Sequence, residues 1–456
     1  MIQVDVNVLF KNARPNRPAT FDEYCRSGGY QALSEAIRKL APKDVIRKVK
    51  DSGLRGRGGG GFPAALKWEG VPEKAPFPRY VVANTDEMEP GTFKDRVLVN
   101  TDPHMVIEGT ILAAYAVSAQ KGFFFIRPSY EMDAELLERE LQVARAAGYL
   151  GKNILGSDFS FDLVVHRSGG RYICGEATAQ VNAIMGNRPH PLKGGPRMAE
   201  QGLWNRPTVV NNVETLACVP HILSQGPEWF KALAKTGTGA GTKLYGVSGK
   251  VTQPGCFELP MGTRLSDIIE EAASGMVRGS EFKAALPGGA STAFMPKQYY
   301  DLEMDFEPVK KAGHRLGTGS IIVFDRQTCL VAATLNMMEF FVRESCGLCT
   351  PCREGLPQIH DLLRRIENGE GKEEFIPMLR ETSAYMRHAY CAFAPGAAEP
   401  VSETVAAPHK RQYSSPSYTA APQKEQTRAW PCRAATGLTI PGSVIKSFLR
   451  CDSFTQ

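Results

Sequence analysis

Three evenly spaced cysteines are the clearest chemical signal in this sequence. Residues 345 to 355 read SCGLCTPCREG, so two residues separate Cys346 from Cys349 and Cys349 from Cys352. A loop with this spacing can direct three thiolates toward one centre, which is typical of a cubane iron–sulfur cluster. Structural zinc is the alternative, although zinc sites more often use two separated pairs of ligands. The spacing therefore favours a [4Fe-4S] cluster.

Such a cluster needs a fourth thiolate, and Cys391 is the best candidate. It lies in YCAFAPGAAEP at the end of the same helical region, and its Pro and Gly neighbours indicate a loop. The remaining cysteines are isolated and more typical of small apolar packing residues or surface thiols. They are Cys25, Cys174, Cys218, Cys256, Cys329, Cys432 and Cys451.

A glycine-rich segment, GLRGRGGGGFPAALKW at residues 53 to 68, is the second signal. It matches the pattern G-x-G-x-x-G, but the preceding residues predict a helix, whereas a dinucleotide fingerprint follows a strand. A flexible linker would be richer in Ser and Thr than this segment, which is flanked by Arg57, Phe62, Lys67 and Trp68. Bare backbone beside cationic side chains favours a loop that binds a phosphorylated cofactor. Together with the cluster, the loop indicates a flavin that accepts two electrons and releases them singly.

An acidic turn follows the first predicted strand. PRYVVAN predicts a short strand ending at Asn84, and the next residues, TDEMEPG, include Asp86, Glu87 and Glu89. Polar groups at the carboxyl end of a strand often mark a ligand site in α/β proteins. A solvated acidic turn is the alternative interpretation.

Hydrophobic periodicity places these motifs in an α/β protein with further modules. Helices predominate from residue 20 to 53, where Thr20 and Glu23 have the spacing of a capping box. Strands and helices alternate up to about residue 235. Residues 240 to 327 predict a small mixed module, and residues 328 to 400 a helical bundle. Residues 401 to 456 are polar and rich in Pro, Ser and Thr, which predicts poor order.

Composition restricts the function classes. The chain has 456 residues, a length typical of two to four domains, and a net charge of +6. Seven Lys or Arg and three acids fall in residues 401 to 456, so the rest is close to neutral. We therefore expect no nucleic-acid partner. The sequence has no secretory signal and no apolar run long enough to cross a membrane, so we expect a cytoplasmic protein with metal-binding cysteines and not disulfides.

Five motifs in order give the sequence a family resemblance. RGRGGGGFPAALKW, NTDEMEPGTFKDR, GGRYICGEATA, PTVVNNVETL and ESCGLCTPCREG resemble the NADH-binding flavoprotein subunit of respiratory complex I, over residues 20 to 400. The resemblance implies a Rossmann-like FMN domain within residues 1–235, a ubiquitin-like β-grasp (SLBB) module and a C-terminal helical bundle that carries one [4Fe-4S] cluster. It also implies hydride transfer from NADH to FMN, and then single-electron transfer through the cluster to quinone.

The resemblance further implies partners and a location. The partners would be a thioredoxin-like [2Fe-2S] subunit and the large iron–sulfur subunit of the peripheral arm of a proton-translocating complex. The chain would lie at the cytoplasmic face of the inner (plasma) membrane without inserting into it. Residues that match the family's motifs would ligate the cluster (Cys346, Cys349, Cys352, Cys391) or contact FMN and nucleotide. The second set is Gly56, Arg57, Gly58, Gly59, Gly60, Gly61, Phe62, Lys67, Asn84, Asp86, Glu87, Glu89, Tyr172, Gly175, Glu176, Asn211, Asn212 and Thr215.

Four positions depart from the family pattern and leave alternatives open. Ala177 replaces a second acid after Glu176, Gly194 and Arg197 replace a lysine and a phenylalanine, and Gly60 replaces an alanine. One alternative is a structural subunit that binds FMN and a cluster but handles NADH poorly. Another is the diaphorase subunit of an NAD-linked hydrogenase or formate dehydrogenase. We expect complex I instead, because the sequence has no further cysteine motif near either end. For Asn211 and Asn212, a helix N-cap is an alternative role that can coexist with ligand binding.

Overall fold

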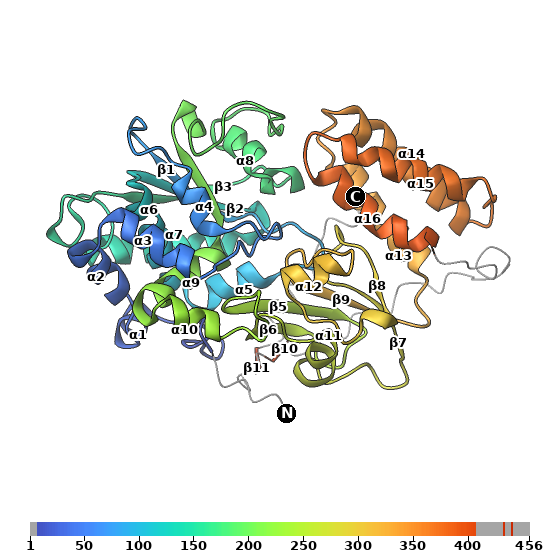
Figure 1. The fold of residues 1–456 in the computed structure, drawn as a ribbon, viewed down its shortest axis with the longest axis horizontal. Coiled ribbons are helices and arrows are strands. Elements are labelled where there is room, and N and C mark those ends of the chain that lie inside the picture. The colour runs from blue at the N-terminus through green and yellow to red at the C-terminus, as the bar shows by residue number, and fades with distance from the viewer. Residues whose placement is uncertain (1–6, 407–431, 434–438, 441–456) are drawn as a thin grey trace.

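The computed structural model describes residues 7–406, 432–433 and 439–440. Figure 1 shows an α/β domain on one side and, on the other, a second sheet below a helical bundle. The two short strands β10 (Cys432–Arg433) and β11 (Thr439–Ile440) pair in antiparallel fashion. The other residues predicted to be poorly ordered after Ala406 lie outside the described part of the chain.

Four helices precede the first sheet. Thr20 begins α1 with the predicted capping box, because its side chain accepts from the Glu23 amide and the Glu23 carboxylate accepts from the Thr20 amide. The helix α3 ends two residues before Gly53, so the glycine loop follows a helix as predicted. The four helices are α1 (Phe21–Arg26), α2 (Gln31–Lys39), α3 (Pro42–Asp51) and α4 (Ala64–Glu69).

The first sheet is parallel, with the strand order β3-β2-β1-β4. Its strands are β1 (Tyr80–Thr85), β2 (Lys121–Ile126), β3 (Asp162–Arg167) and β4 (Thr208–Asn212). The connecting helices are α5 (Lys94–Thr101), α6 (Pro103–Val117), α7 (Glu131–Ala146) and α8 (Ala177–Ile184), and α9 (Val213–Gln225) and α10 (Pro227–Ala232) follow β4. The chain reverses its direction of strand addition between β1 and β4, which is where open parallel sheets bind ligands.

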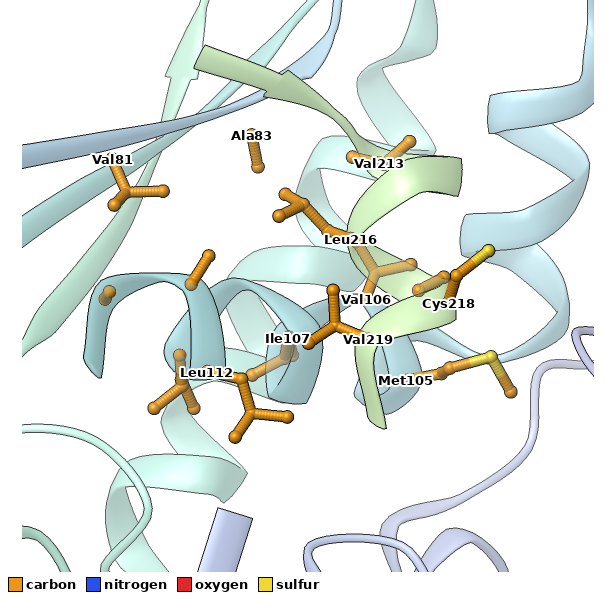
Figure 2. Close-up of a cluster of buried hydrophobic side chains, with 14 of the residues drawn as sticks. Val81, Ala83, Met105, Val106, Ile107, Leu112, Val213, Leu216, Cys218 and Val219 are labelled. Atoms are coloured by element: carbon orange, nitrogen blue, oxygen red, sulfur yellow. The ribbon is translucent and has the colours of Figure 1, made fainter. Parts of the chain in front are cut away.

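One face of this sheet packs on α6 and α9. Figure 2 shows Val81 and Ala83 of β1 above Ile107 of α6 and Leu216 of α9. The two helices approach closely at Gly109, where an added Cβ would lie 2.0 Å from the carbonyl oxygen of Leu216. The core on this side fixes where β1 and β4 end, and therefore where the loops after them begin.

The second sheet has the order β6-β5-β9-β7-β8. Its first strand β5 and last strand β9 pair in parallel at the centre, with antiparallel neighbours on both sides, as expected for a β-grasp module. The strand β7 was not predicted from the sequence. The elements are β5 (Thr242–Gly249), β6 (Gly255–Pro260), α11 (Leu265–Asp267) with a π-helical turn (Ile268–Ala272), β7 (Phe282–Leu286), β8 (Met295–Pro296), α12 (Phe306–Lys311) and β9 (Ser320–Asp325).

The bundle consists of α13 (Leu330–Glu344), α14 (Thr350–Glu367), α15 (Phe375–Tyr385) and α16 (Phe393–Ala406). The prediction that disorder begins at residue 401 was wrong for the last turns of α16. Val401 is fully buried, and the Thr404 hydroxyl lies 2.9 Å from that of Thr334. The bundle core continues into the second face of the first sheet through Val82, Phe125 and α8.

Candidate functional site

The carboxyl ends of β1 and β4 open into a cavity of about 300 Å³. Asn84 and Asn212 are register partners at these ends, so two amide side chains meet at the reversal of strand order. A volume of this size lies at the lower end of the range for small-molecule sites. The walls come from the glycine loop, the turn after β1, the segment before α8, two loops of the second module and the segment before α16.

Eleven predicted contact residues line this cavity. They are Gly58, Gly59, Gly60, Asn84, Asp86, Glu87, Glu89, Tyr172, Gly175, Glu176 and Asn212. The other seven, Gly56, Arg57, Gly61, Phe62, Lys67, Asn211 and Thr215, are not among the lining residues. Asn212 is also the N-cap of α9 and accepts from the Glu214 amide, so the alternative role proposed for it from the sequence is confirmed.

Residues just outside the cavity hold the glycine loop in place. The buried Arg57 guanidinium points toward the second module and donates to the carbonyl oxygens of Ala240 at 2.7 Å and Thr242 at 3.1 Å. Its backbone amide donates to the Thr215 hydroxyl at 2.8 Å. These contacts make Arg57 a positioning residue in this structure, because its side chain is engaged away from the cavity.

The lysine, asparagine and phenylalanine predicted near the ligand are not among the residues that line the cavity. The Lys67 ammonium donates to the Val210 carbonyl at 2.9 Å, and the Trp68 indole donates to the Asn211 side chain at 2.9 Å. Both bonds tie α4 to β4. Phe62 is 51% exposed.

Two glycines of the loop differ in whether the structure has space for a side chain at their positions. An added Cβ at Gly60 would meet no atom within 4 Å, whereas at Gly61, with φ +60°, it would lie 2.6 Å from the Phe306 ring. We expect Gly60→Ala to retain FMN and to stabilise the chain by about 0.4–1 kcal/mol, because it restricts the unfolded chain. Gly61→Ala should instead destabilise it by about 1–2 kcal/mol or more, because of the left-handed backbone and the clash. Urea unfolding and the flavin absorbance per chain test this pair, and equal effects of the two changes would contradict it.

Asp86 presents a buried acceptor without a partner to the cavity. Its Oδ1 accepts from the Ser168 hydroxyl at 2.7 Å, while Oδ2 is buried and has no hydrogen-bond partner among the described residues. A ligand hydroxyl or amide would satisfy this oxygen, which fits the hydrogen-bonding edge and ribityl chain of a flavin. Burial raises the pKa of Asp86 to about 6, although the Ser168 bond opposes the change.

This pKa predicts a pH dependence of stability in the FMN-free chain. The folded chain keeps a proton on Asp86 that the unfolded chain releases near pH 4, so stability falls as pH rises from about 4 to 6. The loss is at most about 3 kcal/mol at 1.36 kcal/mol per pKa unit. Asp86→Asn should remove this part of the pH dependence. Unfolding midpoints of both proteins from pH 4 to 7 provide the comparison, and parallel curves would show that Asp86 contributes nothing.

The other two acids of the turn already have protein partners. Glu87 accepts from the Asp95 amide at 2.9 Å and the Arg96 amide at 3.2 Å, and burial raises its pKa to about 7. Glu89 accepts from the Tyr172 hydroxyl and, at 2.7 Å, from the Ser291 amide. Glu87 thus joins the turn to the start of α5, and Glu89 joins it to the second module.

A buried ion cluster beneath the cavity was missed from the sequence. The Lys94 ammonium lies 2.6 Å from Asp95 and 2.9 Å from Glu214, and its side chain is 1% exposed. Burial acts to lower the pKa of Lys94, but the Asp95 and Glu214 carboxylates raise it overall. Lys243 lies 3.5 Å from Glu214, and burial lowers its pKa to about 8. Lys94 and Asp95 belong to the motif NTDEMEPGTFKDR, so the motif itself contained a signal for them.

The four predicted cluster ligands lie near one another between α13 and α16. Cys349 and Cys352 are buried, Cys346 and Cys391 are partly buried, and the Ser345 hydroxyl lies 3.1 Å from the Cys352 sulfur. Burial raises the pKa of Cys352 to about 12, with further contributions from the other three thiols. The side chains therefore form one neighbourhood.

The four thiols of this neighbourhood are the donor set of a cubane cluster. Among the residues that the structure describes, no group of three or more His, Cys, Asp or Glu side chains is placed to bind a single metal ion. The cysteines of a cubane need not converge on a single ion, because each binds a separate iron atom at a corner.

The cavity and the set of four cysteines share a wall. Cys391 and Phe393 line the cavity, and the Tyr172 ring packs edge-on against Phe393 with centroids 5.3 Å apart. Tyr172 also packs edge-on against Phe340 and Phe341 of α13, the helix that leads into the cysteine loop. A ring bound in the cavity would therefore lie beside one of the predicted cluster ligands.

Three of the four residues that depart from the family pattern lie toward solvent or at α8, and the fourth, Gly60, lines the cavity. Arg197 has a side chain that is 79% exposed and forms an ion pair with Glu200 at 3.2 Å. An added Cβ at Gly194 would meet no atom within 4 Å. Ala177 is the first residue of α8, and Glu176 is its N-cap, accepting from the Ala179 amide at 2.9 Å.

Comparison with known families supports both halves of the site. Residues 49–221 match the profile of the Nuo51 FMN-binding domain, residues 244–293 that of the SLBB domain, and residues 332–410 that of the NADH-ubiquinone oxidoreductase-F iron-sulfur binding region. The F subunit of the NADH-quinone oxidoreductase of Salmonella typhimurium is 45% identical over 85% of this chain and 88% of its own length. The corresponding protein of Mycobacterium tuberculosis is 43% identical over 85% and 87%.

A solved structure is also similar. An NAD⁺-reducing [NiFe]-hydrogenase in its H₂-reduced state matches with a TM-score of 0.75 and 33% identity over 85% of this chain. The match covers 64% of that hydrogenase chain.

The fold and the site define an oxidoreductase subunit that binds FMN and a [4Fe-4S] cluster. With these identities and coverages, the chain belongs to the family of NADH-quinone oxidoreductase F subunits. The resemblance found in the sequence, the fold class and the expected cofactors are confirmed, and NADH is the substrate of the family. In the described part of the chain, no helix has the length and apolar character needed to span a bilayer.

Proposed function

We propose that this chain is the electron-input subunit of a proton-translocating NADH-quinone oxidoreductase. NADH would donate a hydride in the cavity, and electrons would leave through the cluster toward quinone by way of partner subunits. FMN, when bound, supplies the conversion from two-electron to one-electron transfer.

The wall shared by the cavity and the set of four cysteines is the observation that best supports this proposal. Cys391 belongs to both, so the two cofactors of this family would be neighbours within one chain. Proximity of this kind is what successive electron transfer between two centres requires.

The chain's own residues would bind, orient and enclose the flavin. The bare backbone at Gly58 and Gly59 lines the cavity, where a flat ring can approach closely. Asp86 would accept a hydrogen bond through its unpartnered oxygen, and the Asn84 and Asn212 amides would contact polar edges of the ligand. Glu89 would accept from ribose hydroxyls of NADH. Cys346, Cys349, Cys352 and Cys391 would ligate the cluster.

The partners that we propose are a thioredoxin-like [2Fe-2S] subunit and the large iron–sulfur subunit of a peripheral arm. The family name, which designates one subunit of a quinone oxidoreductase, supports assembly into such a complex. We place the chain at the cytoplasmic face of the inner membrane as part of that complex.

Two alternatives have specific support. Similarity to an NAD⁺-reducing [NiFe]-hydrogenase favours a diaphorase role. The exposed Arg197 and the changed residues Ala177 and Gly194 favour a subunit that binds FMN but handles NADH poorly.

Anaerobic addition of NADH to the purified protein tests the proposal. We expect NADH to bleach the visible flavin absorbance as fully as dithionite does. Bleaching by dithionite alone would indicate the subunit with impaired NADH binding. Membranes from cells without this chain should lose NADH-driven quinone reduction. Unchanged quinone reduction, together with loss of NAD⁺-linked hydrogenase activity, would indicate the diaphorase role.

A further inference from the structure

The cavity is lined by two cationic side chains, and they differ in availability. Lys94 lies in the cavity wall, but its side chain is 1% exposed and already pairs with the carboxylates of Asp95 and Glu214. Arg315, in the loop between α12 and β9, lies at the cavity with a side chain that is 44% exposed. Of the two, only Arg315 combines a place in the wall with access to solvent.

Two contacts hold the Arg315 guanidinium in a fixed orientation. Its Nε donates to Glu399 of α16 at 2.5 Å, and its Nη2 donates to the Ser291 carbonyl at 2.5 Å. Within the described part of the chain, Nη1 makes no hydrogen bond, so part of the planar donor face remains free.

The same loop connects Arg315 to the acid proposed to bind ribose. The Ser291 amide donates to Glu89 at 2.7 Å, while the Ser291 carbonyl accepts from Arg315. Ser291 therefore holds the Glu89 carboxylate and the Arg315 guanidinium at a fixed separation. Burial raises the pKa of Glu89 and of Tyr172, and the positive charge of Arg315 opposes this change in both.

We propose that Arg315 binds the pyrophosphate of the dinucleotide while Glu89 binds an adjacent ribose. The inference rests on the proposed function, because it assigns a residue to the NADH that the cavity receives. A planar guanidinium with a free donor edge suits phosphate oxygens, and its fixed position reduces the entropy lost on binding. A carboxylate and a cation at a set separation also match the alternation of hydroxyls and phosphates along a dinucleotide.

The competing interpretation is a purely structural tie. The Arg315–Glu399 pair joins the second module to the bundle, and such a tie would stabilise the chain without contacting substrate. The two interpretations predict opposite effects when Glu399 is neutralised. Glu399→Gln keeps an acceptor for Nε but removes a negative charge near the phosphate, so it should strengthen phosphate binding if Arg315 binds it.

Equilibrium binding to the FMN-loaded full chain separates the interpretations. ADP-ribose is the main probe, because it has the pyrophosphate and both riboses but no nicotinamide, and adenosine is the phosphate-free probe. We expect Arg315→Ala to weaken ADP-ribose binding about 10-fold or more, as for the loss of a charge-assisted hydrogen bond. Adenosine affinity should not change. Arg315→Lys should give an intermediate loss, because it keeps the charge but not the planar donors.

Arg326→Ala is the matched control. Arg326 lies in the same module and pairs with Glu281 at 2.8 Å, but both side chains are at least 70% exposed and neither lines the cavity. We expect wild-type affinity for both probes in this variant, and tighter ADP-ribose binding than wild type, by about 2- to 5-fold, in Glu399→Gln.

Three results would overturn the inference. Unchanged ADP-ribose affinity in Arg315→Ala would exclude Arg315 as the phosphate ligand. Equal weakening in Arg315→Ala and Glu399→Gln, with matching losses of thermal stability, would support the structural tie. Failure of the wild-type chain to bind either probe would contradict the proposed function itself, and the inference with it.

Discussion

Replacement of Cys349 with alanine is expected to abolish the EPR signal of the reduced cluster while FMN remains bound. Cys349 is a buried member of the set of four cysteines but does not line the cavity. Its loss therefore removes a thiolate without altering the flavin contacts. A cubane missing one of its cysteine ligands loses a corner of its attachment to the protein. We therefore expect iron to fall from about four per chain to near zero.

The control for this change is Cys329→Ala. Cys329 is partly buried at the start of α13 and lies outside the cysteine loop, so iron and the EPR signal should remain as in the wild-type protein. Cys391→Ala should differ from both variants. It should lose the cluster and also perturb flavin absorbance, because Cys391 lines the cavity. An unaltered EPR spectrum in Cys349→Ala would refute the assignment of this ligand.

Replacement of Lys94 with methionine should produce the largest loss of stability. The change leaves Asp95 buried without its cation and Glu214 with Lys243 alone, and breaking a buried ion pair in this way costs about 3–5 kcal/mol. The midpoint of urea unfolding, followed by near-ultraviolet circular dichroism, measures the effect. Bound FMN should also be lost at lower urea concentrations, because Lys94 and Asp95 form part of the cavity wall.

Lys231→Met provides the comparison at the surface. Lys231 and Glu228 pair at 2.9 Å, but their side chains are 44% and 83% exposed, so the loss should be at most about 1 kcal/mol. A Lys94→Met, Glu214→Gln double variant should be less unstable than the two single changes predict together, because their effects are coupled. If Lys94→Met shifted the midpoint no more than Lys231→Met, the buried cluster would not support the site.

Local signals were sufficient to predict most of the fold. The capping box at Thr20, the strand that ends at Asn84 and the alternation up to residue 235 depend on contacts between residues near in sequence. The strand β7 was missed because its five residues, FKAAL, are too short to show periodicity without a neighbouring strand. The end of α16 was missed because its order depends on contacts such as that between Thr404 and Thr334, which are distant in sequence.

Site residues could be predicted where they lie in one continuous segment. They were harder to predict where segments of different modules come together. The glycine loop and the acidic turn each line the cavity as expected. The direction of Arg57 could not be predicted, because the carbonyls that bind it belong to Ala240 and Thr242, far along the chain. Ser291 and Arg315 were missed for the same reason, because they belong to two loops of the second module that meet only in the folded chain.

We propose that one chain places a flavin cavity against a group of four cysteines that binds a cubane. The amounts of FMN, iron and acid-labile sulfide in the anaerobically purified protein decide whether this claim holds. We predict about one FMN, four iron and four sulfide per chain. A colourless protein that contains neither flavin nor iron would contradict the claim.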